Sequence, residues 1–111
     1  MVRRIAQTSQ ESGAVPVAGV EQQVVLAPIS NNETIHALAV YWSYSGTPTN
    51  GGLTVYSDVT ELLDVDITSA GPGFLPLDKL RTLNPGEELI VTLNAGGAVV
   101  GKLNVHGFGV K

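Results

Sequence analysis

The sequence predicts an all-β fold, a single antiparallel β-sandwich of jelly-roll-like form with an extended N-terminal arm. Short runs alternate apolar and polar residues with period two, which is typical of strands that bury one face. Clusters of Gly, Pro, Asn and Ser separate these runs at spacings of about ten residues, giving roughly six to eight strands. Hydrophobic residues make up 43% of the chain and charged residues 14%, a composition that folds rather than staying disordered. We place the sandwich at residues 14–111 and the arm at residues 1–13.

The first 13 residues are polar, rich in Gln, Ser and Thr, and lack periodicity. Alone, such a segment cannot bury enough apolar surface to offset its ordering entropy. We therefore expect either a flexible tail or an arm that a partner orders, in which case Arg3 and Arg4 suit an acidic groove on a neighbour. No apolar stretch follows the two arginines, so no secretory signal is expected, and we expect a soluble chain made in the cytosol.

The first half of the sandwich contains two predicted strand regions. The first, Val15 to Ile29, is limited by Pro16 and Pro28, because proline cannot donate to a β-ladder. The second, Thr34 to Tyr44, is apolar on both sides: His36, Leu38, Val40 and Trp42 alternate with Ile35, Ala37, Ala39 and Tyr41. A strand of this kind is central, with its second face against another layer or another subunit. Residues 45–52 form a turn at the tip of the sandwich.

The middle of the chain continues with short strands. Leu53 to Ser57 is one, and a turn follows it. Leu62 to Thr68 alternates apolar with acidic side chains, as a half-exposed antiparallel strand does. Residues 74–77 read as a short apolar connection, and residues 78–83 fit either a helical turn or a strand.

The last third is the segment around which we expect the domain to be organised. Asn84-Pro85-Gly86 is turn chemistry, and an alternating run begins at Leu89. The run stops at Asn94-Ala95-Gly96-Gly97, and a second alternating run follows through Val105. These features predict a long antiparallel hairpin at the centre of the domain.

Composition argues against several partners. The net charge is −4 with no basic stripe, so nucleic acid is not an expected partner. No segment approaches the roughly 20 apolar residues of a membrane-spanning helix, so no membrane partner is expected. The chain has no cysteine, which leaves neither a disulfide nor a thiolate metal site.

No combination of residues in the sequence indicates a catalysed reaction. We therefore predict no catalytic residue, no metal, no cofactor and no enzyme activity. The acidic residues gather at Asp58, Glu61, Asp64 and Asp66. A solvated strand face, whose charges discourage edge pairing, accounts for them better than a calcium site. His36 and His106 are the only histidines, too few for zinc without carboxylates, and we expect both to be packed. Neither a Gly-x-Ser-x-Gly elbow nor a phosphate-binding glycine loop is present.

Between Ile35 and Val110 the sequence resembles the capsid decoration, or cement, proteins of tailed bacteriophages, which are jelly-roll-like trimers. The resemblance lies in a glycine loop before Leu53-Thr54-Val55-Tyr56, Leu63-Asp64-Val65-Asp66-Ile67 leading into Gly71-Pro72-Gly73-Phe74-Leu75-Pro76, Pro85-Gly86-Glu87, Leu89 to Leu93, and Gly96-Gly97 to Val105. It covers about two thirds of the chain.

The resemblance implies a viral structural protein on the capsid exterior of the virion: a homo-oligomer, a trimer, that stabilises the phage head by binding the major capsid protein where shell subunits meet. Apolar residues on second strand faces supply the expected subunit interface: Ala37, Ala39, Tyr41, His106, Phe108 and Val110. Arg3, Arg4 and Ile5 are the expected capsid-contacting residues of the arm.

Two other function classes remain open. A receptor-binding or carbohydrate-binding tip domain would use the 45–52 loop and aromatic rings, such as Trp42 and Tyr44, that can stack on a sugar. Because Trp42, Tyr41 and Tyr44 lie within one strand, core or interface packing explains them more simply. A small β-barrel enzyme would need metal ligands that the sequence does not display.

Overall fold

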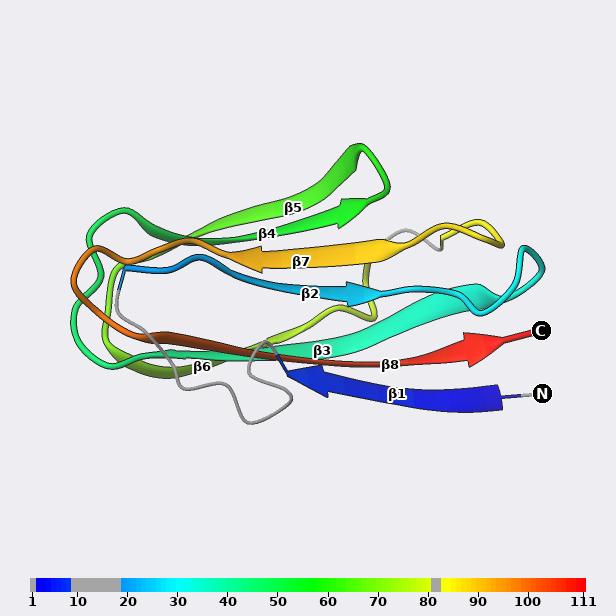
Figure 1. Cartoon of the computed structure of the whole chain (residues 1–111), viewed down its shortest axis with the longest axis horizontal. Helices are drawn as coiled ribbons and strands as arrows, with labels where there is room; N and C mark the ends of the chain where they lie inside the picture. The colour runs from blue at the N-terminus through cyan, green and yellow to red at the C-terminus, as the bar shows by residue number, and fades with distance from the viewer. Residues whose placement is uncertain (1, 9–18, 81–82) are drawn as a thin grey trace.

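The computed structural model describes residues 2–8, 19–80 and 83–111, and in them the chain forms two four-stranded antiparallel sheets packed face to face (Figure 1). The strands are β1 (Val2–Thr8), β2 (Gln22–Leu26), β3 (Thr34–Tyr44), β4 (Gly51–Ser57), β5 (Thr60–Ile67), β6 (Gly71–Pro76), β7 (Leu89–Leu93) and β8 (Gly101–Val110). The described residues contain no helix. The predicted all-β sandwich is confirmed.

The strand order is that of a jelly roll. One sheet has the order β1-β8-β3-β6 and the other β2-β7-β4-β5. The pairs are nested: β4 forms a hairpin with β5, and β3 with β6, β2 with β7 and β1 with β8 enclose it in turn. Such nesting arises when one long antiparallel ribbon folds over on itself, and it produces the two Greek keys of a jelly roll.

The predicted C-terminal hairpin is wrong. β7 pairs with β2 and β4, whereas β8 pairs with β1 and β3, so the two strands lie in opposite sheets (Figure 1). The glycine loop at residues 94–97 carries the chain from one layer to the other. β7 and β8 each have one apolar face. When the two strands lie in opposite sheets, their apolar faces pack against each other and both are buried, whereas in a hairpin both faces would need another layer to cover them.

The predicted N-terminal arm is also wrong where the structure describes it. Val2–Thr8 is an edge strand of the chain's own sandwich, paired with β8 from Val2 opposite Val110 to Thr8 opposite Asn104. Ile5 is 7% exposed and belongs to the core. One inward apolar side chain creates no visible periodicity, which is why the sequence pattern indicates no strand. Residues 9–13 of the predicted arm lie outside the described residues.

A β-bulge in β3 changes the expected faces. The register with β8 shifts between Ala37 and Ala39, so Leu38 is an extra residue. A single extra residue exchanges the two faces of the rest of a strand. The inward side chains are therefore Ile35 and Ala37 before the bulge and Val40, Trp42 and Tyr44 after it.

Other strand predictions hold with shifted bounds. β5 exposes Asp64 and Asp66 as expected. The expected apolar connection at 74–77 is part of β6, an edge strand with exposed Pro72 and Pro76. Proline suits an edge strand because it has no N–H to donate.

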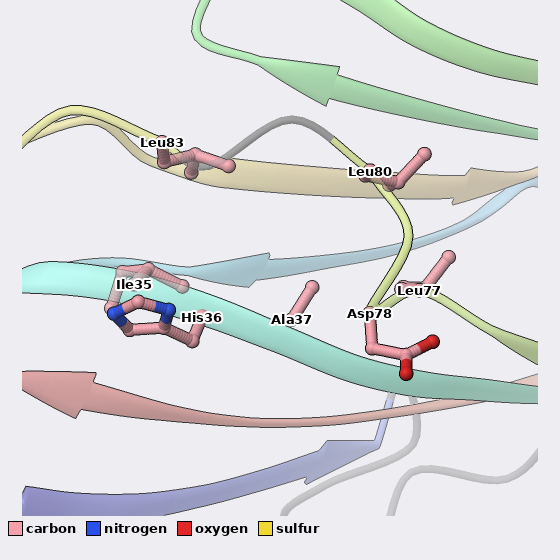
Figure 2. Close-up of a pocket in the computed structure, with 7 residues that line it drawn as sticks. All are labelled: Ile35, His36, Ala37, Leu77, Asp78, Leu80 and Leu83. Carbon is pink, nitrogen blue, oxygen red and sulfur yellow. The ribbon is translucent and has the colours of Figure 1, made fainter.

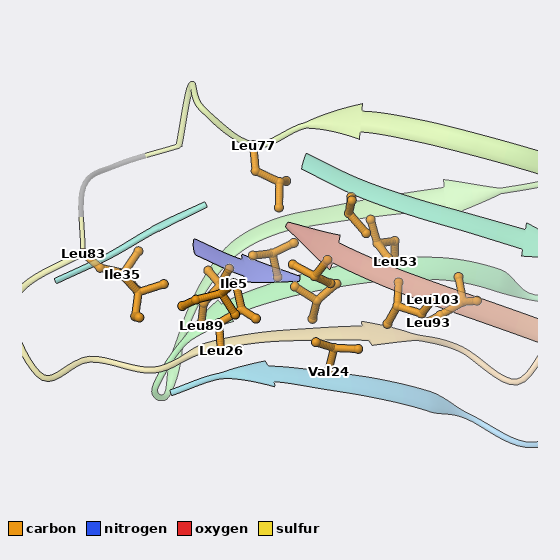
Figure 3. Packing of buried hydrophobic residues seen from close by; sticks show 14 of the residues in the cluster. Ile5, Val24, Leu26, Ile35, Leu53, Leu77, Leu83, Leu89, Leu93 and Leu103 are labelled. Carbon is orange, nitrogen blue, oxygen red and sulfur yellow. The ribbon is translucent and has the colours of Figure 1, made fainter. Parts of the chain in front are cut away.

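The core lies between the two sheets (Figure 3). Its fully buried members, at most 1% exposed, include Leu26, Ile35, Val40, Leu53, Val55, Leu89, Val91, Leu93, Leu103 and Val105. Burial of each such side chain stabilises the fold by about 1.5–3 kcal/mol. A binding surface on the sheets would therefore lie on their outer faces.

Candidate functional site

Five ring side chains meet on the outer face of the sheet β1-β8-β3-β6, and we call them the aromatic face: His36, Tyr41, Phe74, His106 and Phe108. His36 and Phe108 stack with ring centroids 4.9 Å apart and an angle of 11°. Tyr41 lies 5.0 Å from Phe74 and 5.2 Å from His106. The rings thus form two groups on this face, the pair of His36 and Phe108 on β3 and β8, and the group of Tyr41, Phe74 and His106 on β3, β6 and β8. Tyr41 and Phe74 remain 42% and 54% exposed.

The alternation of β8 explains two of these five rings. His106 and Phe108 point outward because Gly107 and Gly109 take the inward positions. A Cβ at Gly107 would stand 2.6 Å from the carbonyl oxygen of His36, and one at Gly109 would overlap the Glu33 carboxylate. Close packing of the inner layer therefore requires glycine at both positions, and the side chains of His106 and Phe108 are left outside.

Beside the aromatic face, towards β1, lies an open groove of about 670 Å³. Its walls are Val2, Arg4, Ile5, Ala6, Leu38, His106, Gly107 and Phe108. Leu38 is 45% exposed and Val2 64% exposed. The β3 bulge presents Leu38 to the groove, and Arg4 is its one cation. Within the described chain Arg4 has no ion-pair partner.

The structure places most of the predicted interface residues on one surface. Ala39, Tyr41, His106, Phe108 and Val110 share the outer face of this sheet. Ala37 does not, because it precedes the bulge and packs against the core.

The prediction missed Phe74, Leu38 and His36. Phe74 had a detectable signal, since it alternates with Gly71, Gly73 and Leu75 and faces Tyr41 in the ladder. The bulge that exposes Leu38 leaves no such signal.

The three residues assigned to the capsid-contacting arm separate in the structure. Arg3 binds Glu33 through Nη2 to Oε1 at 2.6 Å and Nε to Oε2 at 3.0 Å. The Arg3 guanidinium, together with the backbone N–H of Ile29 donating at 2.9 Å, lowers the pKa of Glu33 to about 2. Ile5 is buried. Of the three, only Arg4 is exposed.

Two of the aromatic residues that could stack on a sugar, Trp42 and Tyr44, are turned inward, whereas Tyr41 is exposed. Trp42 packs against the core and lies over Gly73, where a Cβ would overlap its indole ring. Tyr44 is 2% exposed, its hydroxyl donates to the carbonyl of Asn94 at 2.8 Å, and burial raises the pKa of its phenol. The Tyr44 ring is therefore not accessible to a ligand, and the Trp42 ring is partly buried. The 45–52 loop is tied to residues 96–100 by backbone hydrogen bonds from Thr49 and Ser45.

Two further depressions are less suited to a ligand. A cavity of about 60 Å³ is lined by residues 35–37 of β3 and by Leu77, Asp78, Leu80 and Leu83 (Figure 2). A shallow polar groove of about 490 Å³ runs beside Asp64 and Asp66 on the other sheet. Across residues 2–8, 19–80 and 83–111, no three His, Asp or Glu side chains gather where they could hold a metal ion. The same residues include no helix long and apolar enough to cross a membrane.

Comparison with known proteins gives structural matches alone. No family model matches the sequence, and no curated protein matches it. Chitosan-binding module 1 of a chitosanase/glucanase from Paenibacillus sp. IK-5 superposes with a TM-score of 0.47 at 13% identity, covering 94% of each chain. A carbohydrate-binding module of lichenase 5A from Cellvibrio mixtus, in complex with cellotriose, gives 0.41 at 14%, covering 97% of this chain and 87% of the module. Dimeric latent PorU from Porphyromonas gingivalis gives 0.47 at 13%, covering 96% of this chain and 13% of PorU.

These TM-scores and identities are too low to assign a ligand or an activity to this chain. The matched structures described above are not phage capsid proteins. The resemblance to decoration proteins therefore remains a proposal.

Proposed function

We propose that this chain is a structural subunit that assembles with copies of itself through the aromatic face, as a trimer, and that the assembly decorates the head of a tailed bacteriophage. One observation carries the assembly step. Tyr41, Phe74, Leu38 and Val2 are each more than 40% exposed on one sheet face, next to the stacked pair of His36 and Phe108.

An exposed surface of this composition favours a protein partner. Monomeric proteins rarely expose large contiguous apolar patches, and buried interface centres are enriched in aromatic residues and arginine. Arg4 supplies the arginine beside the rings. The residues that line the groove include no Asp or Glu. An apolar partner surface can therefore cover the groove without burying an unpaired carboxylate of this chain.

The rings are also arranged for packing against a second protein surface rather than as a flat platform. Tyr41 meets Phe74 at 43° and His106 at 67°. Tilted rings interlock with side chains of another surface, as in a protein core. At the edge, Pro72 and Pro76 on β6 remove N–H donors, which disfavours association by strand addition. At the β6 edge, association face to face is therefore favoured over strand addition.

The capsid step follows from the resemblance of residues 35–110 to decoration proteins. Arg4 stays exposed, but it lines the groove assigned to assembly, so we do not assign it to the shell contact. Arg3 and Ile5 stabilise the subunit itself, so we do not propose that they contact the shell.

Sedimentation velocity of the purified chain tests the assembly step. We expect a trimer, and we expect Tyr41→Lys to yield monomers because it places an amine among apolar groups. The matched control is Tyr56→Lys, which changes the same residue type on the outer face of the other sheet and leaves the trimer intact. A wild-type chain that remains monomeric at high concentration would refute assembly.

Co-sedimentation with phage heads that lack the protein tests the capsid step. We expect the wild-type trimer to pellet with the heads and the monomeric Tyr41→Lys variant to bind more weakly, because three linked sites gain avidity. A trimer that never binds heads would refute decoration and leave assembly standing.

Carbohydrate binding is the second candidate function. It is favoured by the half-exposed rings of Tyr41 and Phe74 on one face, since aromatic rings stack on sugars. The Cellvibrio neighbour is named a carbohydrate-binding module and the Paenibacillus neighbour a chitosan-binding module, but their similarity to this chain is too low to support the assignment. A glycan array with wild type and Phe74→Ala decides the point: binding lost in the variant supports this function.

A further inference from the structure

The two edges of the aromatic face differ, and we infer that they contact each other between copies: Phe74 of one copy enters the β1-side groove of another. The inference rests on the assembly step proposed above. It names which parts of the face meet.

Phe74 lies at one edge of the sheet. It stands on β6, the strand at the far end from β1 in the order β1-β8-β3-β6, and it is 54% exposed. The prolines at 72 and 76 lie on either side of it on the same face. Tyr41 supports the ring from one side at 5.0 Å. The result is an apolar projection with a rigid base.

The groove lies at the opposite edge. It runs over β1 and β8, and its floor and walls are apolar, with Leu38, Ala6 and Phe108 around an open volume of about 670 Å³. Ala6 is small and exposed, so no side chain of β1 fills the space above it. An apolar groove of this size accepts a large aromatic side chain with its neighbours.

Charge complementarity commits the groove to a second copy. Arg4 lines the groove at the β1 edge. Asp78 follows the end of β6 and is exposed at the other edge. Neither forms an ion pair within the described part of the chain. When Phe74 of one copy lies over β1 of the next, Asp78 of the first copy approaches Arg4 of the second.

Contact between different edges is compatible with two symmetries. In an isologous pair, each copy places Phe74 in the groove of the other, and the approach of Asp78 to Arg4 occurs twice. In a ring, the contact repeats from copy to copy until the rotation closes, and a trimer is the smallest such ring.

Photo-crosslinking tests the contact while keeping an aromatic ring in place. Benzoylphenylalanine replaces Phe74, a mixture of isotopically light and heavy chains is irradiated, and mass spectrometry locates links between copies. We expect links to the groove residues Val2, Ala6, Leu38 or Phe108. The control replaces Tyr56 on the other sheet and gives no links between copies. Links from position 74 to β6 of another copy, or an intact oligomer without groove links, would overturn the inference alone, whereas a monomeric wild-type chain would overturn the assembly step as well.

A charge exchange supplies an independent readout of the same contact. Arg4→Glu and Asp78→Arg should each weaken association about tenfold, and the double variant should recover most of the loss, because the swapped charges attract again. The variants are followed by sedimentation at several concentrations. Equal and additive losses without recovery in the double variant would contradict the pairing of these two edges.

Discussion

Arg3 and Glu33 are thirty residues apart in the chain and form a two-bond ion pair that fastens the edge strand β1 to the β2–β3 loop. The Glu33 side chain is 2% exposed, and Nη2 of Arg3 also donates to the carbonyl of Ala27 at 3.2 Å. Gly109 leaves the space that the carboxylate occupies. A segment whose composition predicts an arm is thereby held in the sandwich by one ion pair and one buried isoleucine.

We predict that Glu33→Gln removes an acid-dependent part of the stability. The pKa of Glu33 falls from 4.5 to about 2 on folding, so the ionised side chain stabilises the fold above pH 4.5, and this contribution is lost as the pH falls from 4.5 towards 2. Thermal unfolding of both proteins across pH 2–7 should show a wild-type advantage at pH 7 that shrinks over this window. A difference in Tm that does not vary with pH would contradict the role given to the ion pair.

We predict that Ile5→Ala lowers the free energy of unfolding by about 2–4 kcal/mol, because it leaves a cavity in the core. The matched control is Thr8→Ala on the same strand, where the side chain is exposed and the change should stay within about 0.5 kcal/mol. Urea titration of dilute protein measures both. Equal, negligible effects would mean that Val2–Thr8 is an arm after all.

We predict that Gly109→Ala destabilises the fold by about 1–3 kcal/mol, the range for overpacking a filled site. A methyl group at this position overlaps Glu33, which cannot move without breaking its bonds to Arg3. Gly46→Ala is the comparison, since its methyl group meets one Val99 methyl at 3.1 Å, and that side chain can shift. If thermal melts show equal losses for the two variants, the space at Gly109 is not the constraint.

We predict that a chain without Leu38 still folds. Removing the bulged residue leaves Ile35, Ala37 and Val40 on one face in unbroken alternation, at the cost of the hydrogen bond from the Leu77 N–H to the Leu38 carbonyl, worth about 1 kcal/mol. Deleting Tyr41 instead turns Trp42 outward and should prevent folding. Circular dichroism and thermal melts distinguish the two deletions, and comparable melts for both would argue against the bulge assignment.

The local sequence pattern alone predicts that the protein consists of strands, and it predicts the outward orientation of the β8 residues of the candidate site. Alternation in β5, β7 and β8 predicts which side chains are buried, and the glycines of β8 predict that His106 and Phe108 face away from the core. These inferences succeed because each depends on residues two apart on a single strand.

Only the tertiary structure decides which strands share a sheet and which rings meet. The β7 and β8 runs would fit a hairpin or opposite layers equally well, and the bulge at Leu38 reverses the faces of Trp42 and Tyr41. The capture of β1 likewise depends on Glu33, a residue distant in the chain. Sequence alternation describes one strand at a time, whereas layer, register and bulge follow from the burial of all eight strands together.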